Sequence, residues 1–275
     1  MNKELTVDRS DRQLITVVLI GNYPPDNQYS MLRSVDLFRT VLVDAGLRTQ
    51  VIHPVDRIGK IRSLFPQLDK WLGYIDKYIL FTVELAIHLL RHRHVSNIVY
   101  HIIDHSNAVY SFILNKRPHV ITCNDTLAIR SALGQIPENP VRLTGILQNK
   151  AILAGLSRSP RVVCISENTA SELRDLTGDN TSKISVALLP LNYPFRPLSR
   201  QEAFKSLRSL DATVSAAVRS GFILHVGGNQ WYKNRVGAVK IYAELLRLRK
   251  NLKQSQLPLI LLGKRPSPEL LDVMH

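Results

Sequence analysis

The sequence predicts an α/β protein with a doubly wound parallel sheet, followed by a second, smaller Rossmann-like region. Two observations carry this prediction. Short apolar runs of strand length alternate with helix-like segments from residue 14 to residue 189. The same alternation starts again near residue 200, after a segment rich in proline. At 275 residues, the chain is long for one domain and natural for two.

The strands predicted for the first domain are apolar runs bounded by turn residues, as buried parallel strands are. In chain order they are Leu14–Ile20, Thr49–His53, Asn97–Ile103, His119–Cys123, Val162–Ile165 and Ile184–Leu189. Apolar residues recur at helical spacing between the first two strands, from Met31 to Ala45. Ser166 and Gly178 suit the N-cap and the C-terminal end of a further helix.

A linker is predicted at 190–198, where three prolines disfavour regular structure. We therefore assign residues 1–189 to an N-terminal domain and residues 199–275 to the beginning of a C-terminal domain. This second region shows only two predicted strands, Phe222–Val226 and Leu257–Leu262. Two strands cannot bury both faces of a parallel sheet. The C-terminal domain is therefore expected to be only partly present.

The composition excludes several classes of protein. Hydrophobic residues make up 45% of the chain, which argues against global disorder. No uncharged apolar run reaches the length of about 18 residues that a membrane-spanning helix needs. Cys123 and Cys164 each lie in an apolar run and are predicted to be buried free thiols. We therefore expect a cytoplasmic protein.

The net charge of +14 favours polyanionic partners. Basic residues are spread along the chain and no nucleic-acid-binding motif is present, so we expect no nucleic-acid partner. Residues 57–95 combine an apolar stripe and several aromatic residues with interspersed basic residues, among them Lys60, Arg62, Lys70 and Lys77. Such a segment can lie on the cytoplasmic face of an anionic membrane. A pair of ordinary helices packed on the sheet is the alternative interpretation.

Polar residues follow two of the predicted strands at their carboxyl ends. Asp104 and His105 come after the third strand, and Asn124 and Asp125 come after the fourth. Ligands of open α/β sheets bind outside these carboxyl ends, so the four residues are candidates for a functional site. Asp125 suits the N-cap of the next helix equally well.

A strand, a glycine turn and a helix follow one another from Phe222 to Arg249. The turn contains Gly227, Gly228 and Asn229, and the helical spacing begins after Lys233. This arrangement places free backbone N–H groups and a helix N-terminus at the end of a strand, which favours an anion such as a diphosphate. An ordinary αβ turn without a ligand is the alternative, because neither a G-x-G-x-x-G nor a Walker motif is present.

Four segments in this order make the chain resemble the retaining glycosyltransferases of family 4, which have the two-domain GT-B architecture. The segments are Asn22–Gln28, Asn124-Asp125, Ile165–Thr169 and Val226–Asn234. The resemblance extends over nearly all of residues 14–275. It implies transfer of a sugar from a nucleotide-sugar donor to a glycan or lipid-linked acceptor, with retention at the anomeric carbon. It also implies that neither a metal ion nor another cofactor is needed.

The resemblance further implies roles for individual residues. His105 would lie near the reacting carbon as a catalytic residue, with Asp104 and Asp125 beside it. The residues implied to bind the acceptor are Asn22, Asp26, Asn27 and Gln28. Those implied to bind the donor are Gly227, Gly228, Asn229, Lys233, Asn234, Gly263 and Lys264. Among these, Lys233 would contact the donor diphosphate and oppose the charge that develops on the leaving group.

The chain also departs from the family pattern. Pro24 and Pro25 replace the glycines of the early loop, and Gly228 stands where an arginine is often found. Asn124 replaces a histidine, and an amide cannot carry a proton near neutral pH. The family's pair of donor-binding glutamates would lie beyond residue 275. We therefore expect little activity from this chain alone. A non-catalytic interaction domain and a nucleotide-sugar epimerase of the same fold are the alternatives.

Overall fold

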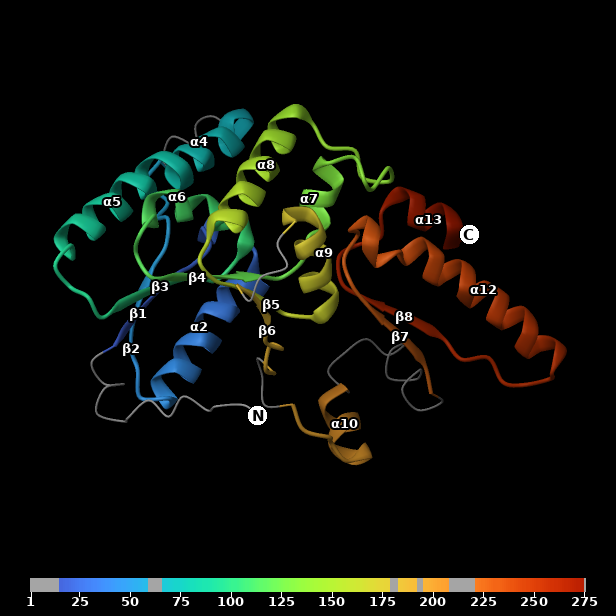
Figure 1. Ribbon diagram of the computed structural model, residues 1–275. Helices are drawn as coiled ribbons and strands as arrows, with labels where there is room; N and C mark the ends of the chain where they lie inside the picture. Colours follow the sequence, from blue (N-terminus) through green and yellow to red (C-terminus); the bar gives the residue numbers. More distant parts are fainter. Residues whose placement is uncertain (1–14, 59–65, 179–182, 192–194, 208–220, 275) are drawn as a thin grey trace. The chain divides into compact units, whose positions relative to one another are not determined.

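The computed structural model describes residues 15–58, 66–178, 183–191, 195–207 and 221–274 (Figure 1). The chain divides into two compact units, residues 1–193 and 194–275. This division falls inside segment 190–198. The start of the first predicted strand at Leu14 and the basic residues Lys60 and Arg62 lie outside the described residues.

The first unit is built on a six-stranded parallel sheet with the order β2-β1-β3-β4-β5-β6. Its strands are β1 (Thr16–Ile20), β2 (Arg48–Ile52), β3 (Ile98–Ile102), β4 (His119–Cys123), β5 (Val162–Cys164) and β6 (Ile184–Val186). The predicted α/β class with a doubly wound parallel sheet is therefore confirmed. The centre of the sheet is apolar on both faces, and Val18, Leu19 and Ile20 of β1 have no exposed surface.

Helices cover both faces of this sheet. Helix α2 (Tyr29–Asp44) packs Val35 and Phe38 against Val17 and Leu19 of β1. The opposite face is covered mainly by α5 (Phe81–Arg91), α6 (Ser111–Leu114), α8 (Leu143–Arg158) and α9 (Glu167–Thr177). Figure 1 shows α2 on one side of the sheet, with α5 and α8 on the other. The alternation of side chains along β1 thus directs successive residues into two separate cores.

Shorter elements connect these layers. They are η1 (Pro24–Asp26), η2 (Pro66–Leu68), α4 (Asp69–Ile75), η3 (Asp76–Leu80), η4 (His105–Tyr110) and α7 (Leu127–Ala132). The element η3 is a π-helical turn that joins α4 to α5 without a break. As predicted, the hydroxyl of Ser166 accepts a hydrogen bond from the Thr169 amide at the start of α9. Gly178 ends that helix in a left-handed conformation.

Helix α8 is an element that the sequence patterns did not predict. It packs so closely on η4 that a Cβ atom at Gly155 would lie 2.3 Å from the carbonyl oxygen of Ala108. The hydroxyl of Ser111 also donates a hydrogen bond to the Gly155 carbonyl. The absence of a side chain at Gly155 therefore sets the distance between this helix and the segment that follows β3.

The second unit contains the parallel pair β7 (Ile223–Val226) and β8 (Leu259–Leu262). Its helices are α10 (Arg200–Leu207), α12 (Arg235–Asn251) and α13 (Pro268–Met274), and η5 (Trp231–Lys233) precedes α12. Leu224, Val226 and Leu262 are more than half exposed. Apolar side chains of both strands are therefore left uncovered by the described residues of this unit.

Cys123 and Cys164 are buried free thiols at directly paired positions of β4 and β5, as the sequence predicted for each of them.

Candidate functional site

A polar cluster lies at the carboxyl edge of the first sheet, where β1 and β3 end side by side. Ile20 and Ile102 are paired in register, so the residues that follow them come close together. The side-chain amide of Asn22 donates to Oδ2 of Asp104 over 2.7 Å, and both side chains are almost fully buried. The sequence placed these two residues in separate roles, whereas the structure joins them in one network.

Asp104 is the centre of this network. Its carboxylate also accepts from the hydroxyl of Ser106 over 2.7 Å and from the side-chain amide of Asn124 over 3.3 Å. Burial by itself would raise the pKa of Asp104. Hydrogen bonds from His105, Ser106 and Asn22 outweigh this effect and hold that pKa well below its usual range. Asp104 is therefore a carboxylate at neutral pH.

His105 lies against this carboxylate. Its Nδ1 atom is 3.2 Å from Oδ1 of Asp104 and 3.3 Å from the backbone nitrogen of Asn124. Burial alone would lower the pKa of His105, but the hydrogen bond and charge of Asp104 outweigh it and raise the pKa. Among the described residues, Nε2 of His105 has no hydrogen-bond partner. The ring is thus oriented through Nδ1.

Asp125 plays a different part from Asp104. It is exposed, and its Oδ1 accepts a hydrogen bond of 3.0 Å from the Leu127 amide at the start of α7. The N-cap position of α7 is occupied by Thr126, so the alternative assignment of Asp125 as the N-cap is off by one residue, and Asp125 bonds to the first helical amide from just outside the helix. The charge of Asp125 adds a smaller contribution to the raised pKa of His105.

The early loop closes over one side of the cluster. Gln28, at the N-cap position of α2, accepts a 2.6 Å hydrogen bond from Asn22. Pro24, Pro25 and Asp26 form the helical turn η1, and Asn27 ends it with a left-handed backbone at φ 54°. Asn22 and Gln28 are therefore joined directly, whereas the exposed Asn27 lies at the outer end of the turn.

The same loop is fastened to the π-helical turn η3. Asp26 forms an ion pair of 2.8 Å with Lys77, whose Nζ atom also lies 5.1 Å from the ring centre of Tyr74. The hydroxyl of Tyr23 donates to Asp76 over 2.6 Å. The interpretation of Lys77 as a free basic residue of a membrane-facing surface is therefore wrong, because Asp26 and a set of aromatic rings enclose it.

In the second unit, the predicted donor residues lie around the carboxyl ends of β7 and β8. Gly263 has a φ of +150°, and a Cβ atom there would lie 2.0 Å from the carbonyl oxygen of Gly227. The two strand ends therefore approach each other as backbone against backbone. Asn229 strengthens this junction, because its side-chain amide donates to the Arg265 carbonyl over 2.8 Å.

Arg235 is a member of this group that the sequence reasoning missed. It is 5% exposed, and its Nη1 donates to Oδ1 of Asn229 over 2.6 Å and to the Lys264 carbonyl over 2.9 Å. Its buried Nε atom has no partner among the described residues. A cation in the first turn of a helix opposes the helix dipole, and this was the signal available in the sequence.

Lys233 and Asn234 complete the junction. Asn234 caps α12 by accepting from the Gly237 amide over 3.1 Å, in a left-handed conformation. Lys233 is exposed, and its aliphatic stem lies against Gly227. Within the described chain, no carboxylate comes within ion-pair distance of Lys233, Arg235 or Lys264. The edge formed by β7, β8 and the start of α12 is therefore positively charged.

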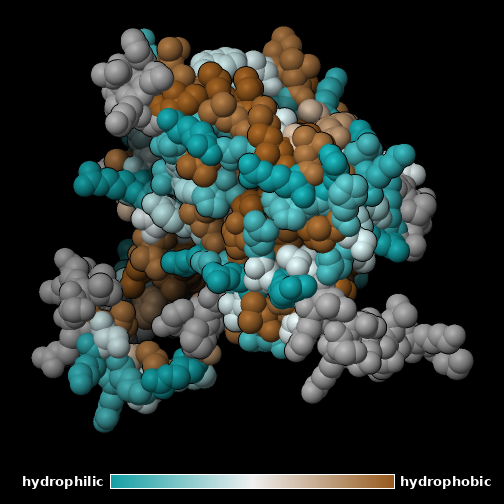
Figure 2. All heavy atoms as spheres, turned by 90° about the vertical axis from the view of Figure 1, so that its left-hand side faces the viewer, coloured by the Kyte–Doolittle hydropathy of each residue, from teal (hydrophilic) through white to brown (hydrophobic). Residues whose placement is uncertain are grey.

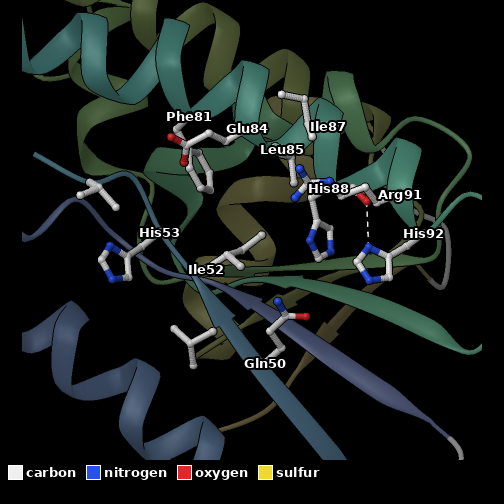
Figure 3. A pocket seen from close by; sticks show the side chains of 12 residues that line it. Gln50, Ile52, His53, Phe81, Glu84, Leu85, Ile87, His88, Arg91 and His92 are labelled. Carbon is white, nitrogen blue, oxygen red and sulfur yellow. Dashed lines mark hydrogen bonds between the residues drawn. The ribbon is translucent and has the colours of Figure 1, made fainter. Parts of the chain in front are cut away.

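A pocket of about 600 Å³ lies between β2 and α5, and none of the predicted site residues lines it (Figure 3). Its polar lining consists of Gln50, His53, Glu84, His88, Arg91 and His92. Burial, with the nearby His92 and Arg91, lowers the pKa of His88. Nε2 of His88 is buried and has no hydrogen-bond partner in the described structure.

The described residues contain neither a metal-binding group of side chains nor a membrane-spanning helix. No group of three or more His, Cys, Asp or Glu side chains there is arranged to hold a metal ion. In the same residues, no helix has both the length and the apolar character that crossing a membrane requires.

The first unit has the features of a Rossmann-like α/β domain, namely a doubly covered parallel sheet with polar residues gathered at its carboxyl edge. No protein-family profile and no curated protein matches the chain. Among solved structures, the chain is similar to Glycyrrhiza uralensis UGT73P12 complexed with glycyrrhetinic acid 3-O-monoglucuronide. The sequence identity is 11% and the TM-score is 0.41, over 94% of this chain and 70% of that one.

Proposed function

We propose that this protein is a retaining glycosyltransferase of the GT-B type that takes its sugar from a nucleotide-sugar donor. The observation that carries the proposal is the uncompensated positive charge at the end of β7 and β8. Lys233, Arg235 and Lys264 meet there without a described carboxylate partner, beside a helix N-terminus. The acceptor we propose is a glycan or a lipid-linked glycan.

The donor diphosphate fits the chemistry of this edge. Arg235 is a buried cation whose hydrogen-bond acceptors within the described residues are neutral oxygens, and leaving a buried charge without a counter-charge is costly. A diphosphate supplies that charge and accepts hydrogen bonds from the start of α12. We propose that Lys233 contacts the same group and stabilises the negative charge that grows on it as the sugar departs. Gly227 and Gly228 let the phosphates approach the backbone closely.

The polar cluster of the first unit fits the recognition of sugar hydroxyl groups. In the proposed arrangement, Nε2 of His105 binds the substrate and Asp104 positions the ring through Nδ1. The carboxylate of Asp104 accepts hydrogen bonds from Asn22, Ser106 and Asn124, so we assign it a positioning role. Asn22 and Gln28 hold the early loop beside this cluster.

The proposal is tested by measuring the binding of UDP-, GDP- and ADP-sugars by titration calorimetry. Lys233→Ala is expected to weaken binding about ten- to a hundredfold, since a hydrogen bond to a charged group is worth about 1.5–3 kcal/mol. Lys240→Ala is the matched control, because Lys240 is exposed on α12, the helix that follows Lys233, and lies farther from the N-terminus of that helix. Failure of every donor to bind, or equal behaviour of the two variants, would contradict the proposed donor site.

Activity assays separate the remaining alternatives. Transfer to an acceptor supports the glycosyltransferase. An epimerised nucleotide-sugar that forms without an acceptor would identify an epimerase. Donor binding without any turnover would identify a non-catalytic domain.

A further inference from the structure

One side of the first unit carries a row of exposed apolar side chains. We call it the apolar ridge, and it consists of Leu68, Trp71, Ile79, Val83, Ile87 and Leu90, which are 42–63% exposed. The row follows η2, α4, η3 and α5 along their outer side. Figure 2 views the molecule from this direction and shows hydrophobic residues gathered in the upper part of the face.

The apolar ridge is not the face by which α5 packs on the sheet. Phe81 and Leu85 perform that packing and are 2% and 1% exposed. The segment therefore has two apolar faces, of which only one is buried. Ordinary packing of helices on the sheet explains the inner face alone. A continuous exposed apolar surface of this kind marks a site of interaction.

An apolar pocket opens beside the ridge. It lies between α4, η3, α5, η4, α6 and α8 and has a volume of about 490 Å³. Trp71 belongs to both the ridge and the pocket, and Tyr74, Tyr78, Phe112 and Leu147 also line the pocket. This volume lies within the range of about 300–1,000 Å³ that is usual for pockets that bind small molecules.

Positive charge surrounds these apolar surfaces. Arg91 and Arg93 are exposed at the end of α5, and Lys150 is exposed one turn after Leu147 on α8. The guanidinium of Arg158 lies 4.8 Å from the ring centre of Phe112. The acidic side chain of Glu84, on the same helix as the ridge, is held in an ion pair by Arg57. Combined with the net charge of +14, this arrangement complements an anionic surface.

We propose that the apolar ridge docks on an anionic lipid bilayer, with Trp71 at the interface and a lipid hydrocarbon chain in the adjoining pocket. Tryptophan suits the boundary between headgroups and acyl chains. The apolar side chains gain by leaving water, and the surrounding arginines and lysines attract anionic headgroups. Docking of this kind is independent of the proposed sugar transfer, so a failure of either leaves the other standing.

Vesicle flotation tests the proposal with the whole chain. The wild type is expected to float with vesicles of phosphatidylcholine and phosphatidylglycerol, and less with phosphatidylcholine alone or at high salt. Ile79→Ser with Val83→Ser should reduce the partition coefficient about tenfold or more, because two half-exposed apolar side chains are lost. The matched control is Ile241→Ser with Leu252→Ser, which removes two side chains of similar exposure from the second unit.

Three results would overturn the proposal. They are no flotation of the wild type, equal flotation of the ridge and control variants, and equal binding to neutral and anionic vesicles. Analytical sedimentation tests the alternative that the ridge joins two copies of the protein. A dimer that the ridge variant loses and the control variant keeps would contradict docking on lipid.

Fluorescence tests the position of Trp71. Trp231→Phe leaves Trp71 as the single tryptophan of the chain. Its emission is expected to shift to the blue on binding, and lipids with brominated acyl chains should quench it. Binding without quenching would contradict insertion of Trp71 beside a hydrocarbon chain.

Discussion

Replacing Gly263 with alanine should unfold the junction between β7 and β8. The added Cβ atom would lie 2.0 Å from the carbonyl oxygen of Gly227, so the two backbones must separate by roughly an ångström to restore normal contact. The residue would also hold an unfavourable φ of +150°. Separation would break the hydrogen bonds from Asn229 to Arg265 and from Arg235 to Lys264.

The size of the effect follows from these contacts. Backbone strain costs about 1–3 kcal/mol, and forcing an extra group into a packed site costs about 1–3 kcal/mol. Two weakened hydrogen bonds add about 1–3 kcal/mol. We expect a loss of about 3–9 kcal/mol in the free energy of unfolding of the second unit. A unit of this size has a total of only about 4–12 kcal/mol.

Urea unfolding in a Trp71→Phe background measures this loss, because Trp231 of η5 is then the only tryptophan and reports on the second unit. Gly221→Ala is the control. Gly221 also has a positive φ, of +92°, but an added Cβ would meet only the flexible end of Leu257 at 3.3 Å. If Gly263→Ala costs no more than Gly221→Ala, the backbone contact does not hold the two strands together, and the reasoning is refuted.

Two further predictions concern titration. Asp104→Asn should lower the pKa of His105, since burial then acts without the opposing carboxylate. In the wild type, this pair should contribute stability that is complete below pH 6.5 and is lost as the pH rises through the raised pKa of His105. Imidazole NMR titrations measure the pKa and urea unfolding across this pH range measures the stability, and an unchanged pKa in the variant would exclude the proposed pairing. His101 behaves in the opposite way, because burial lowers its pKa from 6.5 to about 4. Unfolding then takes up a proton below pH 6.5, so His101→Gln should reduce the stability lost between pH 7 and pH 5 by about 2 kcal/mol. Urea unfolding at these two pH values measures the difference, and equal losses in both proteins would contradict it.

The sequence predicted the sheet well because its strands are buried on both faces and appear as short apolar runs. The bounds of β4 agree with the prediction at both ends, and the other strands differ at their ends. Helix α8 was not predicted because Gly145 and Gly155 interrupt its apolar periodicity. Gly155 is required by the close approach of the helix to the backbone of Ala108. A tertiary contact of this kind leaves no periodic signal in the sequence.

The sequence predicted where the residues of the candidate site lie, but it did not predict which residues they bond to. The rule for carboxyl ends of parallel strands indicated Asp104 and His105. It could not show that Asn22 bonds to Asp104, because this depends on β1 and β3 being neighbours. Arg235 was missed because its role depends on Lys264, which lies on another strand's loop. Lys77 was misread because its ion pair with Asp26 depends on the early loop folding against η3, and no local sequence pattern indicates that contact.

The π-helical turn η3 places two consecutive charged residues against the early loop, where Asp76 holds Tyr23 and Lys77 holds Asp26. Tyr110, beyond β3, also donates to the Lys77 carbonyl over 3.0 Å. The loop is therefore part of the same body as the helices that carry the apolar ridge. A ligand that favours another arrangement of the loop changes the affinity of the ridge for its partner to the extent that the two arrangements differ at the ridge. By thermodynamic reciprocity, the partner then changes the affinity for that ligand by the same factor.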